Sequence, residues 1–332
     1  MPGLRSRRAA IVTLFSAATV GIAGIAAADA WQPRRVIEIV VPSAPGGGLD
    51  LAGRTLQGVV EQDKLSGKPL TVLNRPGGGG TVAIAYINTH AGDGHYAVVQ
   101  ALPLITNRLT GQSEIGLGDV TPLAQLLTEQ VIFSVAADSP IKSGQDLITE
   151  LKKDPAGVTV GVSSSPGGQS HIAAALVLRA AGEDPAKLKI VFFDSGGEAA
   201  TALMGGHITV AVTPAAVVLG PAKAGKIRMI GLPAATRQKG ELAEIPTWKE
   251  QGLDVEFSTW RVLVGPKDMT ADEIAWWDDT LGKATSSPEW AAAAERNLWT
   301  IDYKNSKDVR AFLDSEQTRL ADLLKDLGLA KQ

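Results

Sequence analysis

Two glycine-rich loops near the start of the chain limit the folds that it can adopt. They read Pro42-Ser-Ala-Pro-Gly-Gly-Gly-Leu-Asp50 and Asn74-Arg-Pro-Gly-Gly-Gly-Gly-Thr81, and each lies between an apolar run and a helix-like run. Glycine at a strand-to-helix turn lets the backbone approach a ligand closely and present free N–H groups to it. The positive end of the helix dipole then favours an anion. The pair predicts one anion-binding cleft served by two helix N-termini.

The runs around these loops alternate between strand and helix. Residues 36–42, 70–73 and 96–101 are continuous apolar stretches typical of buried strands, and 49–62 and 81–90 have helical spacing. This βαβαβ order predicts an α/β fold with a mostly parallel sheet. Further strands are expected at 121–127 and 130–136. The pattern then restarts, with strands at 158–162, 189–193, 208–213 and 226–232 and helices at 169–181 and 198–204.

The last eighty residues have a different pattern, with helices expected at 271–284 and 289–296. Asn305 or Ser306 caps a final helix that carries an apolar stripe interrupted by Glu316, and Gly328 is its expected C-terminal cap. A chain of 332 residues is long for a single core. We therefore expect two domains: a discontinuous first domain of residues 31–131 and 260–332, and a second domain of residues 132–259. Two crossings join them, near 130–135 and 257–262.

The N-terminus predicts export. Arg5, Arg7 and Arg8 precede an apolar stretch rich in small residues, and small-x-small sites predict cleavage after Ala28 or Ala30. A membrane anchor is the alternative, but the stretch is only weakly apolar. The chain contains no Cys, so disulfides, thiol catalysis and a lipid anchor are excluded. Removal of residues 1–30 takes the formal charge from −3 to −5, which does not favour nucleic-acid binding.

Hydroxyl-rich loops follow two strands of the second half. Ser163, Ser164 and Ser165 precede two glycines and a helix, and short hydroxyls can bond a carboxylate without adding charge. Simple capping of the helix by one serine is the alternative. A second loop of this kind is Asp194-Ser-Gly-Gly-Glu198. At the second crossing, Trp260 is expected to pack in the core or hinge, whereas Arg261 could meet either an anion or a salt-bridge partner.

Motifs of enzymes are weak by comparison. The chain has no Gly-x-Ser-x-Gly elbow, and its four histidines lack the spacing of metal ligands, so no metal or cofactor is expected. Gly78-x-Gly80-x-x-Ala83 fits a permissive dinucleotide fingerprint. However, Gln100 stands at the end of the next strand, where that fingerprint needs an acid.

The order of these segments resembles one known family. Besides the two glycine loops, the similar segments are Asp93-Gly-His-Tyr96, Ser163–His171, Ser195-Gly-Gly-Glu-Ala199, Lys223-Ala-Gly-Lys-Ile-Arg228, Ile245-Pro-Thr247 and Lys249-Glu-Gln-Gly252. Together they are similar to the substrate-binding proteins of tripartite tricarboxylate transporters, also called Bug-type receptors. Thr259-Trp-Arg261 looks like the tricarboxylate-receptor branch. The similarity covers essentially the whole mature chain.

The resemblance implies a type II-like periplasmic binding protein, with two Rossmann-like lobes that close on a small carboxylate. It implies no enzyme activity and no cofactor, but a monomer that delivers its ligand to the permease of a tripartite transporter. Ser43, Gly79 and Thr81 depart from the family pattern where ligand shape is read, so the acid is not named. An exported α/β enzyme acting on a carboxylate is the rival. The expected ligand-binding residues are Ser43, Ala44, Gly46, Gly47, Gly48, Asp50, Gly78, Gly79, Gly80, Thr81, Ser163, Ser164, Ser165, Gln169, Ser170, His171, Ser195, Gly197 and Thr213.

Overall fold

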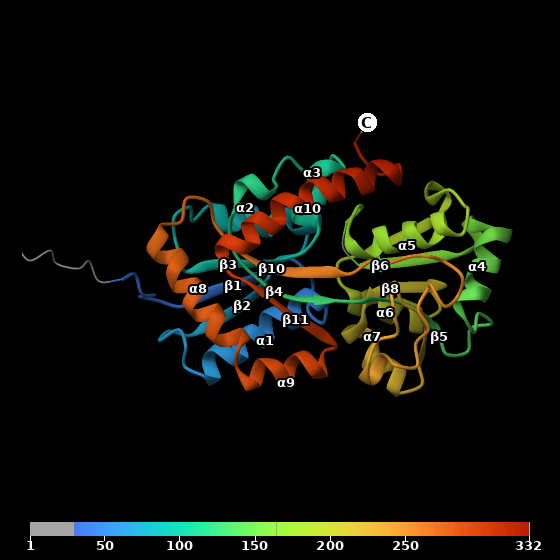
Figure 1. Ribbon diagram of the computed structural model, residues 1–332, viewed down its shortest axis with the longest axis horizontal. Coiled ribbons are helices and arrows are strands. Elements are labelled where there is room, and N and C mark those ends of the chain that lie inside the picture. The colour runs from blue at the N-terminus through green and yellow to red at the C-terminus, as the bar shows by residue number, and fades with distance from the viewer. Residues whose placement is uncertain (1–29, 164, 332) are drawn as a thin grey trace, which may run out of the picture. The chain divides into compact units, whose positions relative to one another are not determined.

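A computed structural model describes residues 30–163 and 165–331 (Figure 1). From Trp31 onward these residues form one compact unit. Ser164 and almost all of the expected signal peptide lie outside the described residues. Among the helices that are described, none combines the length and the hydropathy needed to cross a membrane.

Two β-sheets organise the compact unit. The first has the order β11-β4-β10-β3-β1-β2 and the second the order β7-β6-β8-β5-β9. The strands of the first sheet are β1 (Ile37–Val41), β2 (Leu70–Asn74), β3 (Tyr96–Gln100), β4 (Thr121–Glu129), β10 (Thr259–Gly265) and β11 (Trp299–Lys304). Those of the second are β5 (Val131–Ala136), β6 (Thr159–Ser163), β7 (Lys189–Phe193), β8 (Val210–Pro214) and β9 (Ile227–Gly231).

The two sheets repeat one topology. In each, three strands linked by helices pair in parallel, β2-β1-β3 in the first sheet and β7-β6-β8 in the second. A strand next to a crossing then joins them in antiparallel direction, β10 in the first sheet and β5 in the second. Outside the βαβαβ units the remaining strands, β4, β9 and β11, also pair antiparallel. The expectation of a mostly parallel sheet was therefore wrong for each sheet as a whole.

Helices cover both faces of the first sheet. Alternate residues of β1 point to opposite faces, with Ile37, Ile39 and Val41 in one hydrophobic cluster and Val40 in another. The cluster of Ile39 includes residues of α1 (Gly48–Gln62), α8 (Ala271–Thr285) and α9 (Pro288–Arg296). The cluster of Val40 includes residues of α2 (Thr81–Asn88), α3 (Pro103–Leu109) and α10 (Ser306–Asp326). The C-terminal helices therefore pack on the first sheet, as expected. The second sheet packs with α4 (Gly144–Lys153), α5 (Gln169–Ala180), α6 (Gly196–Met204) and α7 (Ala215–Lys223).

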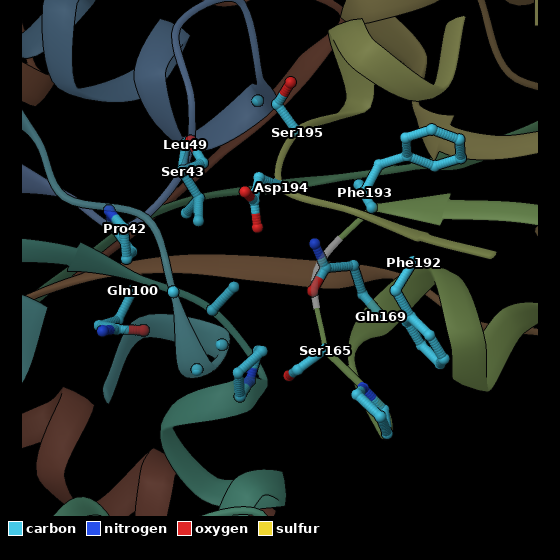
Figure 2. A pocket seen from close by; sticks show the side chains of 18 of the residues that line it. Pro42, Ser43, Leu49, Gln100, Ser165, Gln169, Phe192, Phe193, Asp194 and Ser195 are labelled. Atoms are coloured by element: carbon cyan, nitrogen blue, oxygen red, sulfur yellow. The ribbon is translucent and has the colours of Figure 1, made fainter. Parts of the chain in front are cut away.

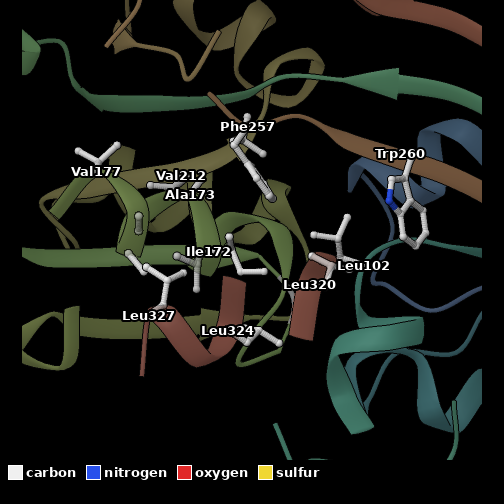
Figure 3. Packing of buried hydrophobic residues seen from close by; sticks show 14 of the residues in the cluster. Leu102, Ile172, Ala173, Val177, Val212, Phe257, Trp260, Leu320, Leu324 and Leu327 are labelled. Carbon is white, nitrogen blue, oxygen red and sulfur yellow. The ribbon is translucent and has the colours of Figure 1, made fainter. Parts of the chain in front are cut away.

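One hydrophobic cluster is continuous from the first sheet to the second. It joins Leu320 and Leu324 of α10 to Ile172 of α5, and it includes Trp260 (Figure 3). The stripe on α10 is interrupted by Glu316 for a visible reason, because the indole N–H of Trp260 donates to Glu316 Oε2 at 2.9 Å. Trp260 is thus a core residue, as expected, with its one polar group satisfied.

The chain passes between the sheets at two places. β4 ends at Glu129 and β5 begins at Val131, and the chain returns to the first sheet just before β10 begins at Thr259. These places match the two crossings expected from the sequence. The domain boundaries at 131/132 and 259/260 stay a prediction, since the described chain from Trp31 forms one compact unit.

Candidate functional site

The first glycine loop connects β1 to α1 and is held by a buried carboxylate. Gly46 lies in the left-handed region, with φ of +83°, and its N–H donates to Asp50 Oδ2 at 3.0 Å. Asn74, at the end of β2, donates to Asp50 Oδ1 at 2.8 Å and to the carbonyl of Ser43 at 2.9 Å. Burial alone would raise the pKa of Asp50, but the bonds from Arg54, Asn74 and Gly46 outweigh it and lower that pKa. Asp50 therefore positions the loop.

The second glycine loop needs glycine at four successive positions. Gly77, Gly78, Gly79 and Gly80 have φ of +125°, +55°, +59° and +99°, a region that other residues rarely adopt. The amide of Asn107, on α3, donates to the carbonyl of Gly78 at 2.9 Å. The loop forms a short 3₁₀ turn, Gly78–Gly80, that leads directly into α2.

The serine-rich loop follows β6 and is held by a neutral histidine. The N–H of Gly167 donates to His171 Nδ1 at 2.9 Å, and burial lowers the pKa of His171 to about 4. His171 is therefore uncharged at neutral pH and acts as an acceptor at this nitrogen. The hydroxyls of Ser163 and Ser170 lie 3.1 Å apart, and Ser165 Oγ donates to Asn107 Oδ1 at 3.0 Å.

These loops meet around a cavity of about 260 Å³ (Figure 2). The parallel strands of both sheets end there, since Pro42 and Ser43 follow β1, Gly77 to Gly79 follow β2, and Gln100 ends β3. From the second sheet, Ser163 ends β6, Asp194 follows β7 and Pro214 ends β8. Open α/β sheets bind ligands at the carboxyl ends of their strands. The cavity lies at the carboxyl ends of the parallel strands, as this rule predicts for a binding site. Strand ends from both sheets line it.

Few charged residues line the cavity. Arg261 and Asp194 are the two charged residues among the described residues that line it. Arg261 is 1% exposed and forms a salt bridge with Glu129, the last residue of β4. Burial lowers the pKa of Arg261 to about 9, so its guanidinium remains charged at neutral pH. Of the two roles open to Arg261, the salt bridge is present, and the side chain also reaches the cavity.

Four polar atoms on residues that line the cavity are buried and have no hydrogen-bond partner in the described part of the chain. They are Ser43 Oγ, Gln100 Nε2, Gln169 Oε1 and Arg261 Nε. A buried polar atom without a partner costs free energy, so such atoms are normally satisfied by water or a ligand. Their convergence on one cavity marks it as a binding site for a polar small molecule.

The expected ligand-binding residues divide between the cavity lining and its support. Those that line the cavity are Ser43, Gly48, Gly78, Gly79, Ser163, Ser165, Gln169 and Ser195. Those that do not line the cavity are Ala44, Gly46, Gly47, Asp50, Gly80, Thr81, Ser170, His171, Gly197 and Thr213. Ser164 lies outside the described residues. Direct binding by any of these residues stays a prediction.

Sequence reasoning did not select several residues that line the cavity. They are Pro42, Leu49, Gly77, Gln100, Ala101, Pro103, Gln112, Pro166, Phe192, Phe193, Asp194, Pro214 and Arg261. Three of them could have been found from the sequence. Gln100, Asp194 and Pro214 stand at or just after the carboxyl ends of predicted strands, where α/β sheets bind ligands. Gln112 gave no such signal, since the loop that carries it is brought to the cavity by tertiary packing. For Arg261 the sequence left an anion contact and a salt bridge open, and the cavity is reached because the crossing strand joins the first sheet.

Fold and site together define a two-lobed α/β binding protein of the periplasmic type. The profile of the family described as "Tripartite tricarboxylate transporter family receptor" matches residues 54–329. This chain belongs to that family. Receptors of the family are periplasmic, bind small carboxylates and work with a tripartite transporter.

Individual relatives agree with this assignment over nearly their whole length. A protein of Cupriavidus necator, described as the UPF0065 protein in the gbd 5′ region, is 27% identical, covering 98% of this chain and 99% of the relative. A ligand-free TctC solute-binding protein from Polaromonas is 26% identical with a TM-score of 0.61, covering 89% of this chain and 99% of that one. The R. palustris protein Rpa4515 with adipate is 21% identical with a TM-score of 0.81, covering 90% and 99%.

Proposed function

We propose that this receptor captures a small di- or tricarboxylate, or an aromatic carboxylate, in the cavity between its two sheets. It then delivers the acid unchanged to the membrane permease of a tripartite tricarboxylate transporter. The observation that carries the proposal is the convergence of two glycine loops and a serine loop on one cavity with unsatisfied polar atoms. The adipate bound to the similar R. palustris protein supports a carboxylate as the ligand.

The first-sheet side of the cavity suits a carboxylate without a free cation. Gly48 begins α1 and Gly78 begins the turn before α2, so backbone N–H groups at two helix starts are available to an anion. The side chains of Ser43 and Gln100 can add neutral donors. Beneath Gly48 lies the guanidinium of Arg261, whose Nη2 is 3.2 Å from where a β-carbon on Gly48 would stand. A β-carbon there would also stand 3.0 Å from Pro214 Cγ, so a side chain at position 48 would be tightly packed.

Contacts across the cavity support a mechanism in which the lobes close on the ligand. The N–H of Ala44 donates to the carbonyl of Asp194 at 3.3 Å, and Ser165 donates to Asn107. A ligand that touches both sheets stabilises this closed arrangement by its differential affinity for it. Small-angle scattering should therefore give a smaller radius of gyration with ligand than without it.

An enzyme acting on a carboxylate is the second candidate, and the contacts of His171 count against it. Its Nδ1 accepts the Gly167 N–H, and its low pKa makes it a poor base at neutral pH. In the two described segments, no group of three or more His, Cys, Asp or Glu residues is placed to hold a metal ion. Incubation of the protein with each acid that it binds, followed by mass spectrometry of the acid, tests for turnover.

The proposal includes the route to the periplasm. The leader is cleaved after Ala28 or Ala30, and the mature protein is released there as a monomer. The sequence of the basic and apolar N-terminal segment supports export. Intact-mass measurement of protein recovered from periplasm identifies the cleavage site, and a mass that includes residues 1–30 would contradict it.

The central experiment is a thermal-shift and calorimetry panel on the mature protein. A bound ligand stabilises the folded state by RT ln(1 + [L]/Kd), so a true ligand raises Tm in a concentration-dependent way. We expect at least one small carboxylate to raise Tm, and its neutral amide analogue to have no effect. Mass spectrometry of small molecules released from freshly purified protein identifies the natural acid. Absence of stabilisation by every carboxylate, or conversion of a bound acid, would overturn the proposal.

A further inference from the structure

Asp194 places an acidic side chain at a cavity that is otherwise suited to an anion. It follows β7 and is exposed, and Figure 2 shows its carboxylate pointing toward the middle of the cavity. The backbone on both sides is fixed: the Asp194 N–H donates to Glu198 Oε2 at 3.2 Å, and its carbonyl accepts from Ala44. The loop therefore fixes the backbone from which this side chain projects.

The charge of Asp194 has no counter-charge in the cavity lining. Arg261 is the other charged residue among the described lining residues, and Glu129 already neutralises it. A ligand that carried only carboxylates would place like charges near one another, which is unfavourable. A ligand with a positive group facing Asp194 removes this conflict.

A second acceptor lies on the same side of the cavity. Gln169, at the start of α5, is 3% exposed and lines the cavity, and its Oε1 has no partner among the described residues. Figure 2 shows Gln169 between Asp194 and Ser165. Ser165 donates its proton to Asn107, so its oxygen offers lone pairs to a ligand. On the second-sheet side, Gln169 Oε1 and Ser165 Oγ are therefore acceptors near Asp194, while on the first-sheet side Gln100 Nε2 is a donor without a partner among the described residues.

We infer that Asp194 selects carboxylates that also carry a protonated amino group, with the carboxylate at the glycine loops and the ammonium at Asp194 and Gln169. The ligand class is thus an amino carboxylate. This inference rests on the proposed function, because it assigns the opposite end of the same bound acid. Asp194 is a specificity residue, and its removal changes which acid binds best.

Matched pairs of acids test the inference. Calorimetry on the mature protein compares glutamate with glutarate, 4-aminobutyrate with butyrate, and 4-(aminomethyl)benzoate with 4-methylbenzoate. We expect the amino member of each binding pair to bind about 10-fold or more tightly than its plain partner, as a hydrogen bond to a charged group provides. Asp194→Asn should weaken the amino member and strengthen the plain acid. Asp314→Asn, an equal charge change on the exposed side of α10, should leave both affinities unchanged.

The outcomes separate this inference from the proposed function. Tighter binding of plain acids by the wild type, or an unchanged preference in Asp194→Asn and Asp194→Ala, would overturn the inference and leave a carboxylate receptor standing. Failure of every acid to bind the wild type would overturn the proposed function and the inference with it. Thermal unfolding of both Asp194 variants checks that they remain folded.

Discussion

The two sides of the cavity are built by different means. The side formed by the first sheet is mainly backbone, where Gly77, Gly78 and Gly79, all with positive φ, and the start of α1 line the cavity. The side formed by the second sheet is mainly side chain, with hydroxyls from Ser163 and Ser165, the amide of Gln169 and the carboxylate of Asp194. Backbone N–H groups recognise a negative charge whatever carries it. The first side can therefore set the class of ligand, and the second can choose among members of that class.

The two sides are also supported by different chemistry. Asp50 is charged and holds the first loop through Gly46 and Asn74. His171 is neutral and holds the third loop through Gly167. Protonation of Asp50 and protonation of His171 weaken these hydrogen bonds at different pH values. The loops on the two sides can therefore be perturbed separately by a change of pH.

Addition of one methyl group to the first side should have the largest effect. In Gly79→Ala, the new β-carbon would stand 2.2 Å from Ser165 Oγ and 2.8 Å from Asn107 Oδ1. The two sides could not approach as they do, and we expect ligand affinity to fall by about 100-fold, the loss of one or two hydrogen bonds to a charged group. Calorimetry with the acid that binds the wild type best gives the measurement.

Gly67→Ala is the matched control for that prediction. Gly67 also has positive φ, at +64°, but a β-carbon there meets no atom within 4 Å. Both variants should lose about 1 kcal/mol of stability from backbone strain. Only Gly79→Ala should lose affinity. Equal affinities in the two variants would show that the glycine loop does not need its close contact with the second side.

Mild acid should weaken the support of the second side before that of the first. The pKa of His171 is about 4 when folded and about 6.5 when exposed, so the unfolded chain binds more protons between these values. Stability is therefore complete above pH 6.5 and falls as pH drops, by about 2 kcal/mol from pH 7 to pH 5. Asp50, whose pKa lies below its ordinary value of 3.8, contributes a loss only at lower pH.

Urea unfolding of wild type and His171→Gln at pH 7 and pH 5 isolates this contribution. The variant lacks the titrating group, so its stability should change less than that of the wild type over this interval. An identical pH dependence in both proteins would mean that His171 does not stay neutral in the folded state.

Removal of hydroxyls from the second side should have the smallest effect. Ser163→Ala together with Ser165→Ala removes two neutral groups, each worth about 0.5–1.5 kcal/mol when bonded. At about 1 kcal/mol for each group, we expect an affinity loss of about 30-fold with the fold intact, as measured by calorimetry and circular dichroism. Ser315→Ala on the exposed face of α10 serves as the control. An unchanged affinity would restrict these serines to shaping the loop.

The sequence predicted most of the regular elements near the cavity. The strands at β1, β2 and β3 and the starts of α1, α2 and α5 lie within about two residues of their expected positions, because continuous apolar runs and glycine turns are local signals. The pattern missed α3, α7 and the strand β11. β11 is an edge strand of which only Trp299 is buried, so it lacks the apolar run that marks a central strand.

The cavity itself was predicted less completely. The glycine and serine loops were identified because their composition is unusual for their position. Pairing in the sheets could not be identified in this way: β10 joins the first sheet antiparallel and brings Arg261 to Glu129, a residue far away in the sequence. Nor could periodicity alone show that the end of β7 faces the end of β1.

By itself, the sequence determined the two α/β units and the turns of the glycine loops, and it predicted that these loops bind an anion. These follow from short-range chemistry, since φ, helix starts and apolar spacing depend on neighbouring residues. Tertiary structure alone decided the joining of the two units around one cavity, the neutralisation of Arg261 and the position of Asp194 in the cavity lining. These features depend on which strand ends, far apart in the sequence, become neighbours in space. The packing of helices on both faces of each sheet determines that arrangement.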